Sequence, residues 1–174
     1  MTLQETAQIL GGIGVIASIV YVGIQIRNNA RAVRAATYLQ VSNTFISYWA
    51  GLAGDAETLS VLLRGSRDFA SLTDNVDLSR YYLSAMANMR RFENAWFQYK
   101  VGVLKQSDWQ TIAYDMDSLF AYPGTRMAWE GIKNRSSIEF RAYVDEVSKR
   151  QEAAAPPPPP AKPPKRKLKK RAFK

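Results

Sequence analysis

An uncharged stretch near the start of the chain limits the possible folds most. Residues 6–26 hold no charged side chain, Glu5 and Arg27 bracket them, and ten of the 21 are Ile, Leu or Val. An α-helix rises about 1.5 Å per residue, so about twenty such residues cross the roughly 30 Å hydrocarbon layer of a bilayer. The stretch therefore predicts an N-terminus and transmembrane anchor over residues 1–26. A signal peptide and a buried helix of a soluble domain are the alternatives, and the first is disfavoured because no Lys or Arg precedes the apolar run.

Small residues recur on one face of this predicted anchor. Ala7, Gly11, Gly14 and Ser18 follow one another at spacings of three or four residues, which places them on one side of a helix. Such residues let a second helix approach closely inside a membrane. We expect this face to pack against another copy of the chain or another membrane protein. The alternative is that glycine is simply common in transmembrane helices.

Three arginines follow the uncharged stretch. Arg27, Arg31 and Arg34 lie directly after it, whereas only Glu5 and the amino terminus precede it. By the positive-inside rule, the C-terminal bulk of the chain lies in the cytoplasm. Their spacing of four and three places the arginines in one stripe, which suits lipid phosphates or an acidic partner at the membrane surface. A solvated helix face is the alternative.

The chain contains no cysteine and no histidine. Their absence excludes disulfides, Ser-His-Asp and Cys-His catalysis, zinc fingers and haem ligation by histidine. Asp115 and Asp117 are two residues apart, so they point to different faces of a helix and do not form a metal-binding pair. We therefore expect no cofactor, no metal and no enzymatic activity.

Helical periodicity continues after the anchor and predicts an all-α chain. Residues 27–54 are predicted to form a juxtamembrane stalk helix that continues the anchor, could break at Asn28–Asn29 and ends at Gly51 or Gly54. Its apolar face is formed by Ile26, Ala30, Val33, Thr37, Val41, Phe45, Tyr48 and Leu52. Residues 55–151 are predicted to form a cytoplasmic domain of four or five small helices.

Capping residues mark the helices of this predicted domain. Asp55 is the expected N-cap of a short helix and Asp74 that of the longest one, while Ser107 and Ser136 each begin a capping-box pattern. Tyr122-Pro123-Gly124 is expected to end a helix. The apolar side of the short helix is Leu59, Leu62, Leu63 and Phe69, and the heptad-like seam of the longest is Tyr82, Ala85, Met89, Phe92, Trp96, Tyr99 and Val103.

A proline-rich basic tail is predicted over residues 152–174. Five consecutive prolines form an extended spacer of about 15 Å. Eight of the chain's 24 Lys and Arg residues follow it, so most of the net charge of +9 is local, and the tail is expected to be disordered until it meets an acidic partner. Its main cluster is Lys165, Arg166, Lys167, Lys169, Lys170 and Arg171. Anionic lipid, nucleic acid, an acidic protein or no partner at all are the alternatives.

Several segments carry a resemblance to a known family. They are IQIRNNARAVRA over residues 24–35, RRFENAWFQY over residues 90–99, YPGTRMAWE over residues 122–130 and the EFRAYVDE ending. With these motifs, residues 1–150 resemble an uncharacterised family of small bacterial single-pass membrane proteins. The resemblance implies an inner-membrane location and a helical domain, and it brings no activity, cofactor or catalytic residue.

A polar group interrupts the longest predicted helix. Glu93 flanks the apolar seam, so we expect it to be half-buried and paired with Arg90 one turn earlier. The structural interpretation is that these residues fix the register of the helix. The functional alternative is a small-ligand sensor or enzyme that holds an anion through Arg90 or Arg91.

The sequence as a whole predicts a membrane-anchored interaction or scaffold protein. Its partner would be a membrane protein, anionic lipid or both, with its C-terminus in the cytoplasm. A membrane tether for nucleic acid or ribosomes through the basic tail is the main alternative.

Overall fold

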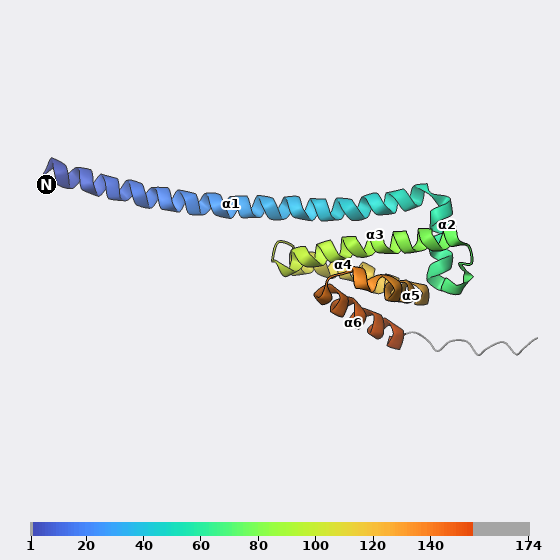
Figure 1. Ribbon diagram of the computed structural model, residues 1–174. Coiled ribbons are helices and arrows are strands. Elements are labelled where there is room, and N and C mark those ends of the chain that lie inside the picture. The colour runs from blue at the N-terminus through green and yellow to red at the C-terminus, as the bar shows by residue number, and fades with distance from the viewer. Residues whose placement is uncertain (1, 155–174) are drawn as a thin grey trace, which may run out of the picture.

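The computed structural model describes residues 2–154, apart from the side chains of residues 5–7 and 9. This part of the chain is all-α, as predicted: one long helix projects from a bundle of smaller ones (Figure 1). The helices are α1 (Leu3–Gly54), α2 (Ala56–Arg67), α3 (Asn75–Lys100), α4 (Gln106–Phe120), α5 (Pro123–Ile132) and α6 (Ile138–Ala154), with short 3-10 turns at Phe69–Ser71 and Lys133–Arg135.

The long helix α1 continues through Asn28–Asn29 without a break and ends at Gly54. Between residues 10 and 26, every Ile, Leu and Val with a described side chain is 53% to 67% exposed. A fully apolar helix surface is unfavourable in water, because the free energy falls when apolar surface is removed from water. The most apolar 18 residues of α1 have a mean hydropathy of 1.6 and none of them is buried, so α1 is long and apolar enough to cross a membrane, although a signal sequence passes the same test.

The last third of α1 packs against the bundle. Val41 and Phe45 are buried there, and the ring centres of Phe45 and Phe92 lie 5.1 Å apart. The predicted apolar face is therefore correct from residue 37 onward. It is wrong for the earlier positions, including Val33, which is 51% exposed, because no helix of the bundle covers that part of α1.

The core lies between α3, α4, α5 and α6. The predicted seam of α3 lies in it: Met89, Phe92 and Trp96 are buried, with Tyr82, Ala85 and Tyr99 partly buried around them. Val103 lies beyond the end of α3. The other helices contribute Trp109, Met116, Phe120, Trp129, Phe140, Val144 and Val147.

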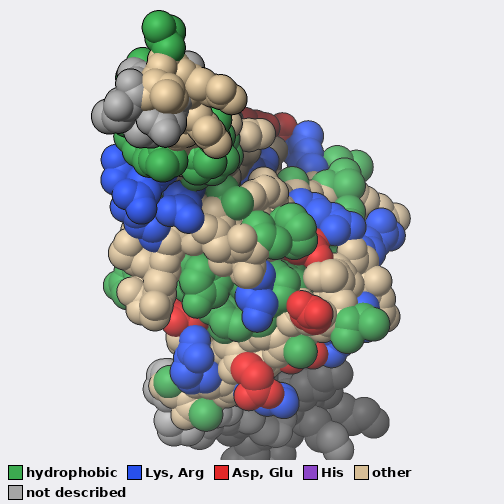
Figure 2. Space-filling view, turned by 90° about the vertical axis from the view of Figure 1, so that its left-hand side faces the viewer, with side chains coloured by type: hydrophobic (Ala, Val, Ile, Leu, Met, Phe, Trp, Pro, Cys, Tyr) green, Lys and Arg blue, Asp and Glu red, His purple; other side chains and the backbone are tan. Residues whose placement is uncertain are grey.

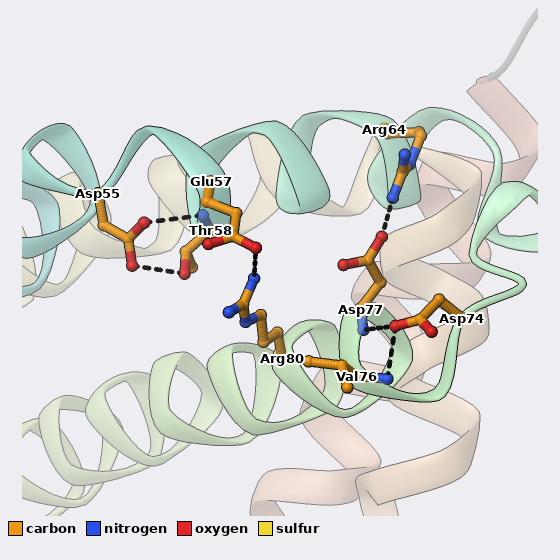
Figure 3. Close-up of polar contacts among 8 residues, drawn as sticks. All are labelled: Asp55, Glu57, Thr58, Arg64, Asp74, Val76, Asp77 and Arg80. Carbon is orange, nitrogen blue, oxygen red and sulfur yellow. Dashed lines mark hydrogen bonds and ion pairs between the residues drawn. The ribbon is translucent and has the colours of Figure 1, made fainter.

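Charged contacts join α2 to the start of α3 (Figure 3). Asp55 accepts from the Thr58 backbone N–H at 3.0 Å, and Asp74 caps α3 in the same way, so both predicted N-caps are confirmed. Ion pairs between Arg64 and Asp77 and between Glu57 and Arg80 then link the two helices. These contacts hold α2 across α3 beside the end of α1.

Gly124 lets α5 touch α2, and Gly65 lets Tyr81 of α3 pack against α2. A Cβ added to Gly124 would lie 1.8 Å from the carbonyl oxygen of Gly65, and one added to Gly65 would lie 2.6 Å from the Tyr81 ring. Gly124, the second residue of α5, is thus a contact point between helices. No side chain fits where these backbones meet.

Two predicted capping boxes are wrong. Helix α4 begins at Gln106, with Lys105 as its N-cap, and the Ser107 hydroxyl donates to Asp108 instead. Helix α6 begins at Ile138, and Ser136 closes the preceding 3-10 turn. In both places a packed turn precedes the helix. The turn, and not the capping-box pattern in the sequence, decides which residue begins the helix.

Candidate functional site

Helix α3 returns along α1 and brings the α3–α4 turn toward the arginine stripe (Figure 1). The Nε of Arg91 donates to the Thr44 carbonyl oxygen at 3.2 Å, which fixes the level at which the two helices meet. From Arg91, α3 runs nine more residues to Lys100, about 14 Å. Nine residues back along α1 from Thr44, also about 14 Å, is residue 35, which lies next to Arg34. The turn after Lys100 therefore lies near the level of Arg34, the last arginine of the stripe.

Lys100 and Lys105 at one end of the bundle therefore lie near the level of Arg34, and Arg31 and Arg27 follow about 5 Å and 11 Å farther out along α1. We call Arg27, Arg31, Arg34, Lys100 and Lys105 the basic collar; all five side chains are exposed. Figure 2 views this end, where blue side chains gather beside the projecting end of α1 and recur over the upper part of the bundle. None of the five forms an ion pair with a described residue, although Lys100 lies 5.6 Å from the centre of the Trp96 ring.

The tip of the α3–α4 turn is apolar as well as basic. Val101 is 53% exposed, and Gly102 adopts a φ of +75°, which favours glycine and lets the turn reverse tightly. An exposed apolar residue between two lysines is the combination that suits the boundary between water and a bilayer. Sequence reasoning missed this turn because only the fold places it beside the stripe.

The polar group on α3 is used for internal contacts. Arg90 donates to Glu93 at 2.7 Å and to the Arg135 carbonyl oxygen, while Glu93 also accepts from the Ser137 backbone N–H at 2.7 Å. The Glu93 side chain is 13% exposed, which confirms the predicted half-burial and pairing. These contacts join α3 to the start of α6.

Arg91 joins α3 to α1. Besides its bond to Thr44, its guanidinium lies over the Tyr48 ring, with 4.1 Å from Cζ to the ring centre. Burial raises the pKa of the Tyr48 hydroxyl. An open groove between α1 and α3 does border Arg90 and Arg91, and the anion-binding interpretation of these residues stays a prediction.

No described residue of the bundle covers the small-residue face of α1 at Gly11, Gly14 and Ser18. At Gly11 and Gly14, nothing lies within 4 Å of the position that a Cβ would take, and the Ser18 hydroxyl donates to the Gly14 carbonyl oxygen of its own helix. The side chain of Ala7 lies outside the described residues. A second helix could therefore approach this face without displacing any described part of the chain.

At the opposite end of the bundle, the end of α1 and helices α2 to α5 surround a pocket of about 390 Å³. Its lining is mostly apolar and includes Leu59, Leu62 and Leu63, the predicted apolar side of α2. Its polar side chains include Asn88 of α3, Asp115 of α4 and Arg67 of α2. Burial raises the pKa of the Asp115 carboxyl.

The cluster of the predicted basic tail, from Lys165 to Arg171, lies outside the described residues. Within residues 2–154, no group of three or more acidic side chains lies close enough together to hold a metal ion.

Comparisons with models of protein families, with curated proteins and with solved structures found no match. The resemblance to small single-pass membrane proteins therefore stays a prediction from the motifs themselves.

Proposed function

We propose that the protein is a membrane-anchored interaction module of the bacterial inner membrane. Its α1 crosses the bilayer once with the amino terminus outside, and the helical bundle lies in the cytoplasm against the anionic leaflet. The basic collar binds lipid phosphates, and the small-residue face of α1 binds a second membrane helix. No catalytic step is part of this proposal.

The position of the α3–α4 turn carries the proposal. If α1 leaves the bilayer near Arg27, the first two turns of helix outside it hold Arg31 and Arg34, and Lys100 and Lys105 lie near the level of Arg34. Each basic residue held close to an anionic leaflet contributes about 1 kcal/mol of attraction. A collar of five cations with no acidic partner among the described residues is thus well suited to phosphate oxygens.

Two labelled positions at opposite ends of α3 test this arrangement. The chain has no cysteine, so Val101→Cys and Val76→Cys each provide one labelling site. Both valines are exposed, at 53% and 58%, and 25 residues of helix, about 38 Å, separate them. The labelled full chain is reconstituted into vesicles with and without phosphatidylglycerol, together with lipid that carries a quencher in its headgroup.

We expect strong quenching at position 101 and none at position 76, with the difference largest in the anionic vesicles. Replacing both Arg31 and Arg34 by Gln should weaken the quenching at position 101. Equal quenching at both positions, or none at position 101, would contradict the proposal. In intact cells, a membrane-impermeant maleimide should not label position 76 until the membrane is opened, and labelling before that step would contradict the orientation.

The small-residue face needs a separate test. Gly14→Leu fills the space that a partner helix would use, whereas Ile16→Leu keeps the size of a neighbouring exposed side chain. We expect a partner or second copy that co-purifies in mild detergent to be lost with Gly14→Leu and retained with Ile16→Leu. Retention with both variants would remove the small-residue face from the proposal.

Binding through the tail is a different function. A chain shortened before Pro156 that keeps its lipid contact and its partner places the binding surface on the described residues. If the shortened chain loses binding, and the full chain binds RNA, the nucleic-acid tether replaces this proposal.

A further inference from the structure

The pocket at the end of α1 contains a buried polar atom without a partner. Asn88 is 7% exposed, and its Oδ1 accepts no hydrogen bond from any described residue. Leaving such an atom unpaired usually costs free energy, so buried amides in folded proteins nearly always have partners. Asn88 lies in the pocket wall, among side chains that are otherwise mostly apolar.

The helix that closes the pocket presents apolar side chains without burying them fully. Leu59 and Leu62 are partly buried, and Leu63 is 51% exposed, whereas the buried positions of α2 are Val61 and Gly65. Opposite them, Tyr48 and Trp49 of α1 line the same space. The pocket is therefore a partly open apolar space with a hydrogen-bond acceptor in its wall, and its 390 Å³ lies in the size range of small-molecule sites.

We propose that this pocket binds an uncharged, mostly apolar small molecule with a hydroxyl or amide N–H that donates to Asn88 Oδ1. A charged ligand fits less well, because a charge among the mostly apolar lining loses its hydration, and Arg67, the cation in the lining, keeps its own charge exposed to water. Asp115 is subject to the same cost, since burial raises the pKa of its carboxyl and no ion pair joins it to a described residue.

The pocket's distance from the membrane restricts where the ligand comes from. Arg27 and Tyr48 are 21 residues apart on one unbroken helix, about 32 Å. A lipid that stays in the bilayer does not reach so far. The ligand thus enters from the aqueous phase. The exclusion of a bilayer lipid rests on the proposed membrane anchor, whereas the pocket itself does not, since it is formed by the bundle and the end of α1.

Matched probes test the hydrogen bond. We would measure binding of 2-naphthol and of 2-methoxynaphthalene, which lacks the donor, to the full chain in lipid nanodiscs by equilibrium dialysis against empty nanodiscs. We expect saturable binding of 2-naphthol at one site and about fivefold to tenfold weaker binding of the ether, the value of one neutral hydrogen bond. No saturable binding of 2-naphthol, or equal binding of both compounds, would overturn the proposal.

Variants of the pocket wall separate a binding role from a structural one. Asn88→Leu should weaken 2-naphthol binding to the level of the ether and raise the melting temperature of the empty protein, because it removes the unpaired oxygen. Asn94→Leu, at an exposed position on the same helix, should leave binding unchanged. If Asn88→Leu folds and still binds 2-naphthol more tightly than the ether, Asn88 does not accept the hydrogen bond and the proposal fails.

A second variant keeps the test valid if Asn88→Leu does not fold. Ser118 is exposed at the edge of the pocket on α4, so Ser118→Phe should narrow the entrance with little effect on the core. We expect at least a tenfold loss of 2-naphthol binding with an unchanged melting temperature. Unchanged binding would place the probe elsewhere on the protein and contradict the proposal.

Discussion

The two parts of α1 have similar apolar side chains in opposite surroundings. Ile16 and Ile19 in its first part are 65% and 67% exposed, whereas Val41 and Phe45 in its last part are 2% and 5% exposed. One unbroken helix joins the two parts. Helix formation is therefore the same in both, and only what covers the apolar side chains differs.

The difference shows that contacts with the bundle bury the apolar side chains of only the last part of α1. Each buried apolar side chain in the last part stabilises the fold by roughly 1.5 to 3 kcal/mol relative to exposure to water. The first part has no such contacts within the described chain, although it is the more apolar one. Lipid or another protein helix would supply the missing burial, and the predictions below separate the two parts by experiment.

The largest effect is expected for a charge placed in the covered part. Val41→Asp puts an unpaired carboxylate in the core and should lower the free energy of unfolding of the bundle by about 3 kcal/mol or more. Val33→Asp makes the same change at an exposed position and should leave the bundle's melting temperature unchanged. Circular dichroism melts of both variants in the same detergent provide the measurement. Equal losses would mean that something covers Val33 as well.

Alanine substitutions at two glycines, one in the bundle and one in the first part of α1, test the same difference in surroundings. Gly124→Ala places a methyl group against the Gly65 carbonyl and should cost about 2 kcal/mol or more, because neither backbone can move freely. Gly14→Ala adds the same methyl group where space is open, and should not lower the bundle's stability. Urea unfolding followed by tryptophan fluorescence measures both. A harmless Gly124→Ala would contradict the close contact of α2 and α5.

A smaller effect is expected for the polar group that joins α3 to α6. Glu93→Ala removes the acceptor for the Ser137 N–H and should cost about 1 to 3 kcal/mol, whereas Glu93→Gln keeps an acceptor and should cost less than about 1 kcal/mol. Arg34→Gln in the basic collar should leave the unfolding free energy unchanged. If Arg34→Gln destabilises the bundle as Glu93→Ala does, the collar has a structural role.

The smallest effect concerns Asp115. Burial raises its pKa above the usual 3.8, so the folded state is penalised once the carboxyl ionises, and the penalty is absent below the unfolded value. Arg67 of α2 lines the same pocket, but no ion pair joins it to Asp115. Asp115→Asn should therefore raise the melting temperature slightly at pH 7 and have no effect below about pH 3.5. A lower melting temperature at pH 7 would contradict this.

Local signals predicted the helices well. The N-caps Asp55 and Asp74 and the end of α1 at Gly54 all follow from residues that act within one turn. The seam of α3 and the pairing of Glu93 with Arg90 follow from helical spacing alone. Such features depend on neighbours in sequence, so the sequence is enough to find them.

Features that depend on contacts between distant segments were missed. The approach of Gly65 to Gly124 and the burial of Asn88 require α2, α3 and α5 to be placed first. Lys100 and Lys105 belong to the basic collar only because α3 returns along α1. The helix starts predicted at Ser107 and Ser136 failed for the same reason, since packed turns shifted them.

Extraction of the full chain from cell membranes with alkaline carbonate tests the central claim most directly. If lipid covers the first part of α1, the protein stays in the membrane pellet, and Ile16→Asp, which costs about 2.5 to 3.5 kcal/mol in a bilayer, releases part of it. Release of the unaltered protein as an intact, folded chain would contradict the account, because water or protein would then surround those isoleucines and valines.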